Sequence, residues 1–66
     1  MKVTLNDRPT EIPEGATVAS LLESISMAER RVAVELNGEI VPRTRYALSP
    51  LSESDRLEVV QFVGGG

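Results

Sequence analysis

A single segment of the chain has the apolar spacing of an amphipathic helix. Four apolar residues recur at i, i+3, i+4 and i+7 and therefore share one helical face. They are Val18, Leu21, Leu22 and Ile25. Thr17 stands directly before them and is typical of an N-cap, because its hydroxyl can accept a hydrogen bond from an unpaired N–H of the first turn. In a chain of 66 residues only a small sheet can cover this face, so we expect one helix packed on one sheet.

Alternating apolar and polar residues before the helix predict a hairpin. Residues 2–6 alternate, Asn6-Asp7-Arg8 supplies turn residues, and residues 10–12 can return as a second strand. Pro9 has no N–H to pair, so we expect it at the start of a strand or at an edge of the sheet.

A second hairpin is predicted after the helix. Residues 32–36 alternate and lead into Asn37-Gly38, a strong hairpin signal because both turn positions require a positive φ. Residues 39–41 then form the returning strand, and Pro42 ends its pairing and indicates an edge strand.

The rest of the chain predicts one more strand. Residues 43–54 are irregular, with a short helical turn near residues 46–48, and residues 57–63 form the last strand. The order is strand, strand, helix, strand, strand, strand. If the first and last strands pair in parallel at the centre, the fold class is α+β with the β-grasp arrangement, a mixed sheet of four to five strands crossed by one main helix.

The last strand has apolar side chains on both of its faces. When Leu57 and Val59 face the helix, Val60 and Phe62 point to the uncovered face. An adjacent apolar pair beside the end of the chain indicates a docking patch. We expect Val60 and Phe62 to bind a partner protein, unless a bulge buries Phe62.

The residues that the chain lacks exclude several kinds of chemistry. It has no cysteine and no histidine, which excludes a disulfide, a thiolate nucleophile, a cysteine zinc site and a histidine base. The net charge is −3 and the basic residues are scattered, which argues against nucleic acid. No signal-peptide pattern or membrane-length apolar run is present. We expect a cytoplasmic protein without membrane contact, catalytic residues or a bound metal.

The sequence ends in Gly64-Gly65-Gly66. Glycines have no side chains to pack and lose the most backbone entropy when ordered. We therefore predict a folded domain over residues 1–63 and a flexible tail over residues 64–66, which reaches about 10 Å when extended. Such a tail can enter a narrow channel and present the Gly66 carboxylate to another protein's active site.

A terminal glycine suits activation of its carboxylate by an external enzyme. A carboxylate is a poor electrophile because its charge repels nucleophiles and its oxygen leaves badly. Joining it to AMP neutralises the charge and supplies a stabilised leaving group, and the absence of a side chain on Gly66 leaves the carbonyl carbon open to sulfur or an amine.

With these features in place, the chain resembles the ThiS family, the sulfur carrier proteins of thiamine (thiazole) biosynthesis, which have the ubiquitin-like β-grasp fold. The resemblance spans essentially the whole chain, and the order and spacing of its segments make it specific. The segments are Met1-Lys2-Val3-Thr4-Leu5-Asn6-Asp7, Thr17-Val18-Ala19-Ser20-Leu21-Leu22, Val34-Glu35-Leu36-Asn37-Gly38-Glu39-Ile40-Val41-Pro42-Arg43 and residues 55–66.

The resemblance implies a mechanism in which the chain is a co-substrate rather than an enzyme. A ThiF-like (E1-like) adenylyltransferase, using ATP and magnesium, adenylates Gly66, and sulfur from a cysteine desulfurase or similar donor converts it to a thiocarboxylate. A ThiG-like thiazole synthase then accepts the sulfur. Gly65 matches the penultimate glycine of the family, and Val60, Phe62 and Gly64 fall where its members contact these partners. No cofactor is implied for the chain itself.

Three alternatives remain open on sequence grounds. The chain can donate sulfur in another pathway, in the manner of the small subunit of molybdopterin synthase or of the carriers that serve tRNA. It can be joined through Gly66 to target lysines as a ubiquitin-like modifier. It can also be a plain interaction module whose tail has no role.

Overall fold

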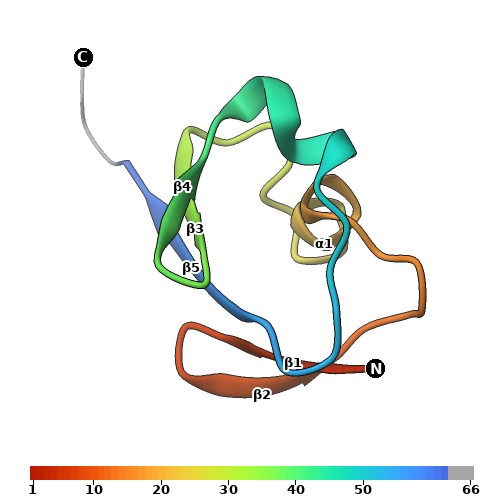
Figure 1. Ribbon diagram of the computed structural model, residues 1–66. Coiled ribbons are helices and arrows are strands. Elements are labelled where there is room, and N and C mark those ends of the chain that lie inside the picture. The colour runs from red at the N-terminus through yellow and green to blue at the C-terminus, as the bar shows by residue number, and fades with distance from the viewer. Residues whose placement is uncertain (63–66) are drawn as a thin grey trace.

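The computed structural model of the chain describes residues 1–62, which form a five-stranded sheet, one α-helix and one 3₁₀-helix. Figure 1 shows the sheet curving around α1, which lies against one of its faces. In chain order the elements are β1 Lys2–Leu5, β2 Arg8–Glu11, α1 Val18–Ser24, β3 Val32–Leu36, β4 Glu39–Val41, η1 Arg43–Leu48 and β5 Arg56–Gln61. This order agrees with the predicted succession of strands around one helix.

The last strand of the chain lies at the centre of the sheet. The strand order is β2-β1-β5-β3-β4. β1 and β5 run parallel, with Thr4 opposite Arg56 and Leu5 opposite Leu57, whereas the other neighbouring pairs are antiparallel. The expected parallel pairing of the first and last strands is therefore confirmed.

Both hairpins turn through two residues with positive φ. Asn6 and Asp7 have φ values of 50° and 67°, and Asn37 and Gly38 have values of 53° and 87°. Two-residue hairpin loops of type I′ require this backbone, which asparagine, aspartate and glycine adopt more readily than other residues. The local sequence therefore determines both turns.

The prediction for the second strand was wrong in its bounds. The strand is Arg8–Glu11 rather than residues 10–12, because the turn before it has only two residues and Arg8 already pairs with Leu5. Pro9 lies inside the strand. Its missing N–H breaks no pairing, since β2 is at the edge of the sheet.

α1 begins at a reciprocal cap. The Thr17 Oγ1 accepts from the Ser20 N–H at 3.1 Å, and the Ser20 Oγ accepts from the Thr17 N–H at 2.9 Å. These two bonds satisfy N–H groups that have no partner within the helix. The predicted N-cap is confirmed, and the apolar stripe faces the sheet, with Val18, Leu21 and Leu22 buried and Ile25 half-buried.

The core fills the space between α1 and the facing side of the sheet. Among residues 1–62 its buried apolar members are Val3, Ile12, Ala16, Val18, Leu21, Leu22, Val34, Leu51 and Leu57. Val3, Val34 and Leu57 come from β1, β3 and β5, the three inner strands of the sheet. One core therefore holds together elements from the whole length of the described chain.

Two further elements differ in length from their predictions. The helical turn expected near residues 46–48 is a 3₁₀-helix over Arg43–Leu48. The strand expected over residues 57–63 is Arg56–Gln61, followed by one more bond in which the Phe62 N–H donates to the Arg31 C=O at 2.9 Å. Val63 lies outside the described residues.

Candidate functional site

The end of β5 alternates between the core and the outer face of the sheet. Leu57 is 1% exposed, whereas Val60 and Phe62 are 56% and 60% exposed. Val59 and Gln61, on the helix side, are half-buried. The prediction that Val60 and Phe62 lie on the uncovered face is confirmed, so Phe62 is not buried by a bulge.

Two apolar residues of β3 and β4 lie on the same face of the sheet. Ala33 stands opposite Val60, and Ile40 stands opposite Glu35. Because opposite residues share a face and successive residues alternate, all of these side chains belong to the outer face. Ile40 is 64% exposed. We call Ala33, Ile40, Val60 and Phe62 the outer-face patch.

Sequence reasoning missed Ile40. The three residues of β4 are too few to show which side faces the core, and the answer depends on pairing with β3. Val41 stands opposite the buried Val34, which turns Val41 inward and Ile40 outward. Only a prediction of this cross-strand register could have found it.

Charged residues lie beside the outer-face patch. Glu35 and Glu58 stand directly opposite each other on the same face, an arrangement that is mildly unfavourable in the isolated chain. An exposed ion pair joins the Arg56 Nη2 to the Asp7 Oδ1 at 2.8 Å. Glu35 thus lies between Ile40 and β5, and a surface that combines exposed apolar side chains with carboxylates is suited to contact with another protein.

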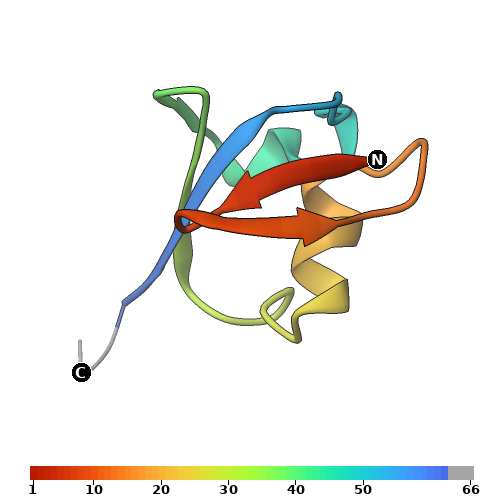
Figure 2. The ribbon, with the colours of Figure 1, turned by 90° about the horizontal axis from the view of Figure 1, so that it is seen from below.

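The three glycines predicted to carry the chemistry, Gly64, Gly65 and Gly66, lie outside the described residues. The structure does place the strand that leads to them. Figure 2 shows β5 continuing past the turn between β1 and β2, away from the body of the domain. β5 thus leads the described chain away from the hairpin of β1 and β2.

The described residues offer no metal-binding cluster. Over residues 1–62, no three Asp or Glu side chains are grouped so that they could hold an ion, and the sequence contains no histidine or cysteine. No helix in the same residues is long and apolar enough to span a membrane.

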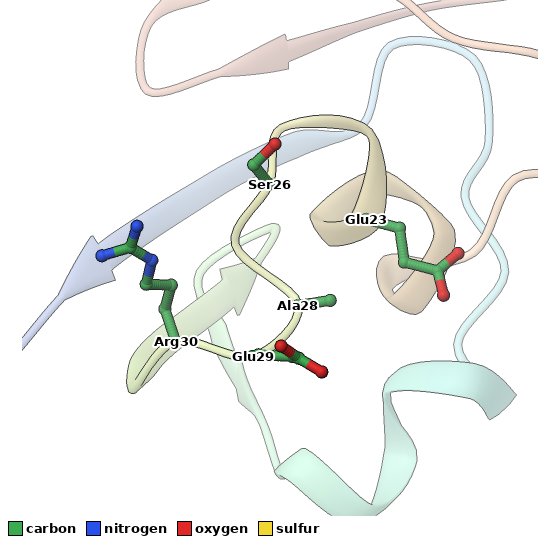
Figure 3. A pocket seen from close by; sticks show the side chains of 5 residues that line it. All are labelled: Glu23, Ser26, Ala28, Glu29 and Arg30. Atoms are coloured by element: carbon green, nitrogen blue, oxygen red, sulfur yellow. The ribbon is translucent and has the colours of Figure 1, made fainter.

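A hollow of about 420 Å³ lies between the end of α1 and the loop that follows it. It is lined by Glu23, Ser26, Ala28, Glu29 and Arg30. Figure 3 shows Glu23 and Glu29 pointing to one side of the loop and Arg30 pointing to the other. The charged groups do not converge on one point, so this hollow lacks the set of directed polar groups that is typical of small-molecule sites.

Comparison with known proteins places the chain among sulfur carriers and their relatives. Residues 3–66 match the pattern of the ThiS family. The sulfur carrier protein ThiS of Escherichia coli is 30% identical over 66 residues, which cover all of both chains. A thiazole synthase of Paramagnetospirillum magneticum is 41% identical over the whole chain, which spans only 20% of that protein.

Solved structures agree with this result. The crystal structure of the thiamine biosynthesis protein ThiS from Geobacter metallireducens superposes with a TM-score of 0.85 at 33% identity, and the match covers all of both chains. This likeness confirms the ubiquitin-like β-grasp fold that the sequence predicts. The match of residues 3–66, together with this fold, shows that the chain belongs to the ThiS family.

Proposed function

We propose that the chain is a sulfur carrier of thiamine biosynthesis and that the Gly66 carboxylate is its working group. The observation that carries this proposal is the match to the ThiS family over residues 3–66, which includes all three terminal glycines. The full-length similarity to the sulfur carrier of Escherichia coli supports the same conclusion. The chain acts as a carrier that is consumed and regenerated, not as an enzyme.

The first chemical step activates the carboxylate. One carboxylate oxygen of Gly66 attacks the α-phosphate of ATP in the active site of a ThiF-like adenylyltransferase, and pyrophosphate leaves. Magnesium, held by that partner with the nucleotide, offsets the phosphate charge. The product is an acyl adenylate whose carbonyl carbon is electrophilic and is not shielded by a side chain.

The second step replaces oxygen by sulfur. The terminal sulfur of a persulfide, formed on a cysteine desulfurase or a similar donor, attacks the carbonyl carbon and displaces AMP. A thiol then cleaves the resulting S–S bond, becoming a disulfide with the donor cysteine, and leaves a thiocarboxylate on Gly66. This thiocarboxylate is the sulfur source for the thiazole ring.

The outer-face patch is proposed as the docking surface for the partner enzymes. Val60 and Phe62 lie within four residues of Gly64 in sequence, and their side chains are more than half exposed, so an enzyme that binds them also receives the glycines. Gly65 and Gly64 enter the partner's channel because no Cβ obstructs them. Burial of exposed aromatic and aliphatic side chains supplies much of the binding free energy at protein interfaces.

A ThiG-like thiazole synthase is proposed as the acceptor of the sulfur. The support is the thiazole synthase of Paramagnetospirillum magneticum, one fifth of which matches this chain. The presence of a carrier-like segment within a synthase indicates that the carrier segment and the synthase segment act on the same sulfur.

Intact mass spectrometry tests the proposal. The purified chain is incubated with ATP, magnesium, a ThiF-like adenylyltransferase and a cysteine desulfurase with cysteine. We expect a mass increase equal to the replacement of one oxygen by sulfur, and no increase for a variant that lacks Gly66. If the chain keeps its mass in a mixture that converts the Escherichia coli ThiS protein, the proposal is wrong. A ladder of conjugates to other proteins would instead identify a protein modifier.

A further inference from the structure

Two asparagine side chains hold the central strand β5 from its two sides. Asn6 is in the turn between β1 and β2, and Asn37 is in the turn between β3 and β4. Each adopts a positive φ, at 50° and 53°, and each hydrogen-bonds to the backbone of β5 through both its main chain and its carboxamide.

The carboxamide of Asn6 makes hydrogen bonds to β5 at the point where the backbone of β1 stops pairing with it. The Asn6 N–H donates to the Leu57 C=O at 2.9 Å, as the next residue of a parallel pair should. The chain then turns away, and the side chain continues the pairing: Oδ1 accepts from the Val59 N–H at 2.8 Å, and Nδ2 donates to the Val59 C=O at 3.1 Å. A longer β1 would have made these two bonds with its backbone.

The two sides of β5 therefore end at different residues. On the β3 side, backbone pairing continues to the bond between the Phe62 N–H and the Arg31 C=O. On the β1 side, the bonds to Val59 are the last ones that the described part of the chain makes. Asn6 is thus the residue that determines where β5 leaves its neighbour, directly before the exposed Val60 and Phe62.

Asn37 has the corresponding place at the other end of the strand. Its N–H donates to the Arg56 C=O at 2.8 Å, and its Oδ1 accepts from the Arg56 N–H at 2.9 Å. Its Nδ2 donates to the Asp55 Oδ1 at 3.0 Å. These bonds hold the start of β5, which is the end remote from the glycines.

We propose that Asn6 is a positioning residue for activation of the C-terminus. By holding both backbone groups of Val59, its carboxamide fixes the direction in which β5 leaves the sheet toward Val60 and Phe62. This role rests on the proposed function. A segment whose direction is fixed before binding loses less conformational entropy when a partner captures it, so Asn6 acts on the KM of the carrier and not on the chemical step.

Matched glycine substitutions test the positioning role. Asn6→Gly and Asn37→Gly each remove one carboxamide at a turn where glycine accepts the positive φ. The rate of ATP-dependent adenylation by a ThiF-like adenylyltransferase is measured against carrier concentration. We expect Asn6→Gly to raise the KM about three- to tenfold with kcat unchanged, and Asn37→Gly to leave both constants within about twofold. Asn6→Asp keeps the acceptor for the Val59 N–H but repels the Val59 C=O, and should lie between Asn6→Gly and the parent chain.

Amide hydrogen exchange supplies the second readout. Exchange at the Val59 N–H should accelerate in Asn6→Gly and not in Asn37→Gly, which separates local release of β5 from general loss of stability. The inference is overturned if Val59 exchanges fast in Asn6→Gly while the KM stays at the parent value, or if Asn37→Gly raises the KM equally. If Asn6→Gly does not fold, Asn6→Asp decides in the same way. Failure of the parent chain to be adenylated would refute the proposed function itself, and the positioning role with it.

Discussion

At the scale of single residues, the segment of β5 and Phe62 contains both buried core side chains and exposed apolar side chains. Leu57 is fully enclosed by the core, whereas Phe62, five positions later, is 60% exposed. Exposing an aromatic ring to water is unfavourable relative to burial, and nothing in the packing of residues 1–62 requires a ring at this position. Burial therefore identifies the residues that stabilise the domain. Exposure of a large apolar side chain identifies the residues that are proposed to bind a partner protein.

Replacement of Leu22 by alanine should lower stability strongly. Leu22 is 1% exposed and lies on the buried face of α1. The change should cost about 2–5 kcal/mol, because a cavity replaces well-packed atoms. Urea unfolding followed by circular dichroism measures this cost. Leu48, which is 71% exposed, provides the control, since Leu48→Ala should cost about 0.5 kcal/mol or less. Equal costs at the two positions would contradict the described core.

Replacement of Phe62 by serine should affect partner binding and leave the fold intact. The exposed ring contributes little to the core, so the melting temperature should change little. The KM for adenylation should rise about tenfold, as expected when one aromatic anchor worth about 1.4 kcal/mol is lost. Leu48→Ser is the matched control, because Leu48 is even more exposed than Phe62 but lies on η1, which packs against α1. A parent-like KM for Phe62→Ser would exclude Phe62 from the docking surface.

At the scale of elements, α1 is short and depends on its cap. It has only seven residues, and neither acidic residues in its first turn nor basic residues in its last turn complement the helix dipole. Helices of this length are not stable alone in water. The reciprocal bonds between Thr17 and Ser20, together with burial of the apolar face, therefore maintain it.

Substitution of Thr17 by alanine should reveal this dependence. Loss of the cap should reduce the free energy of unfolding by about 1 kcal/mol, which lowers the melting temperature of a domain of this size by roughly 4–8 °C. Differential scanning calorimetry measures the change. Thr44, an exposed residue of η1, serves as the control, and Thr44→Ala should melt close to the parent chain. A Thr17→Ala variant as stable as the parent would show that the cap contributes nothing.

The elements were predictable where their signals are local. The Asn37-Gly38 turn and the Thr17 cap each depend on a few adjacent residues, and both were predicted correctly. The bounds of β2 were missed because they depend on how many residues the first turn uses. The bonds from Asn6 to Val59 were missed because they join segments distant in the chain. The outward direction of Ile40 was missed because it follows from the register of β4 against β3 and not from alternation within the three residues of β4. For the candidate site, Val60 and Phe62 followed from alternation alone.

At the scale of the whole molecule, β5 joins two hairpins, β1–β2 and β3–β4, that do not pair with each other directly. It pairs with β1 on one side and with β3 on the other. Its pairing with β1 joins residues far apart in sequence, such as Thr4 and Arg56. Two-stranded hairpins are at best marginally stable in water. Folding of the domain therefore requires the segment that also leads into the glycines.

Two truncations should separate folding from function. A chain that ends at Asp55 lacks β5 and should be unfolded by circular dichroism and NMR. A chain that ends at Phe62 keeps every buried core residue of the described structure and should give a dispersed NMR spectrum close to that of the full chain. It should nevertheless accept no sulfur. An unfolded Phe62-terminated chain would mean that residues 63–66 belong to the fold.

The central claim is that sulfur reaches the thiazole through Gly66. The most direct measurement follows isotopically labelled sulfur from a thiocarboxylate prepared on this chain into the product of a ThiG-like thiazole synthase, in a single turnover with the synthase's other substrates present. The account predicts labelled thiazole phosphate in an amount equal to the thiocarboxylate consumed, with the free Gly66 carboxylate recovered. Unlabelled product, or a thiocarboxylate left intact while thiazole forms, would contradict it.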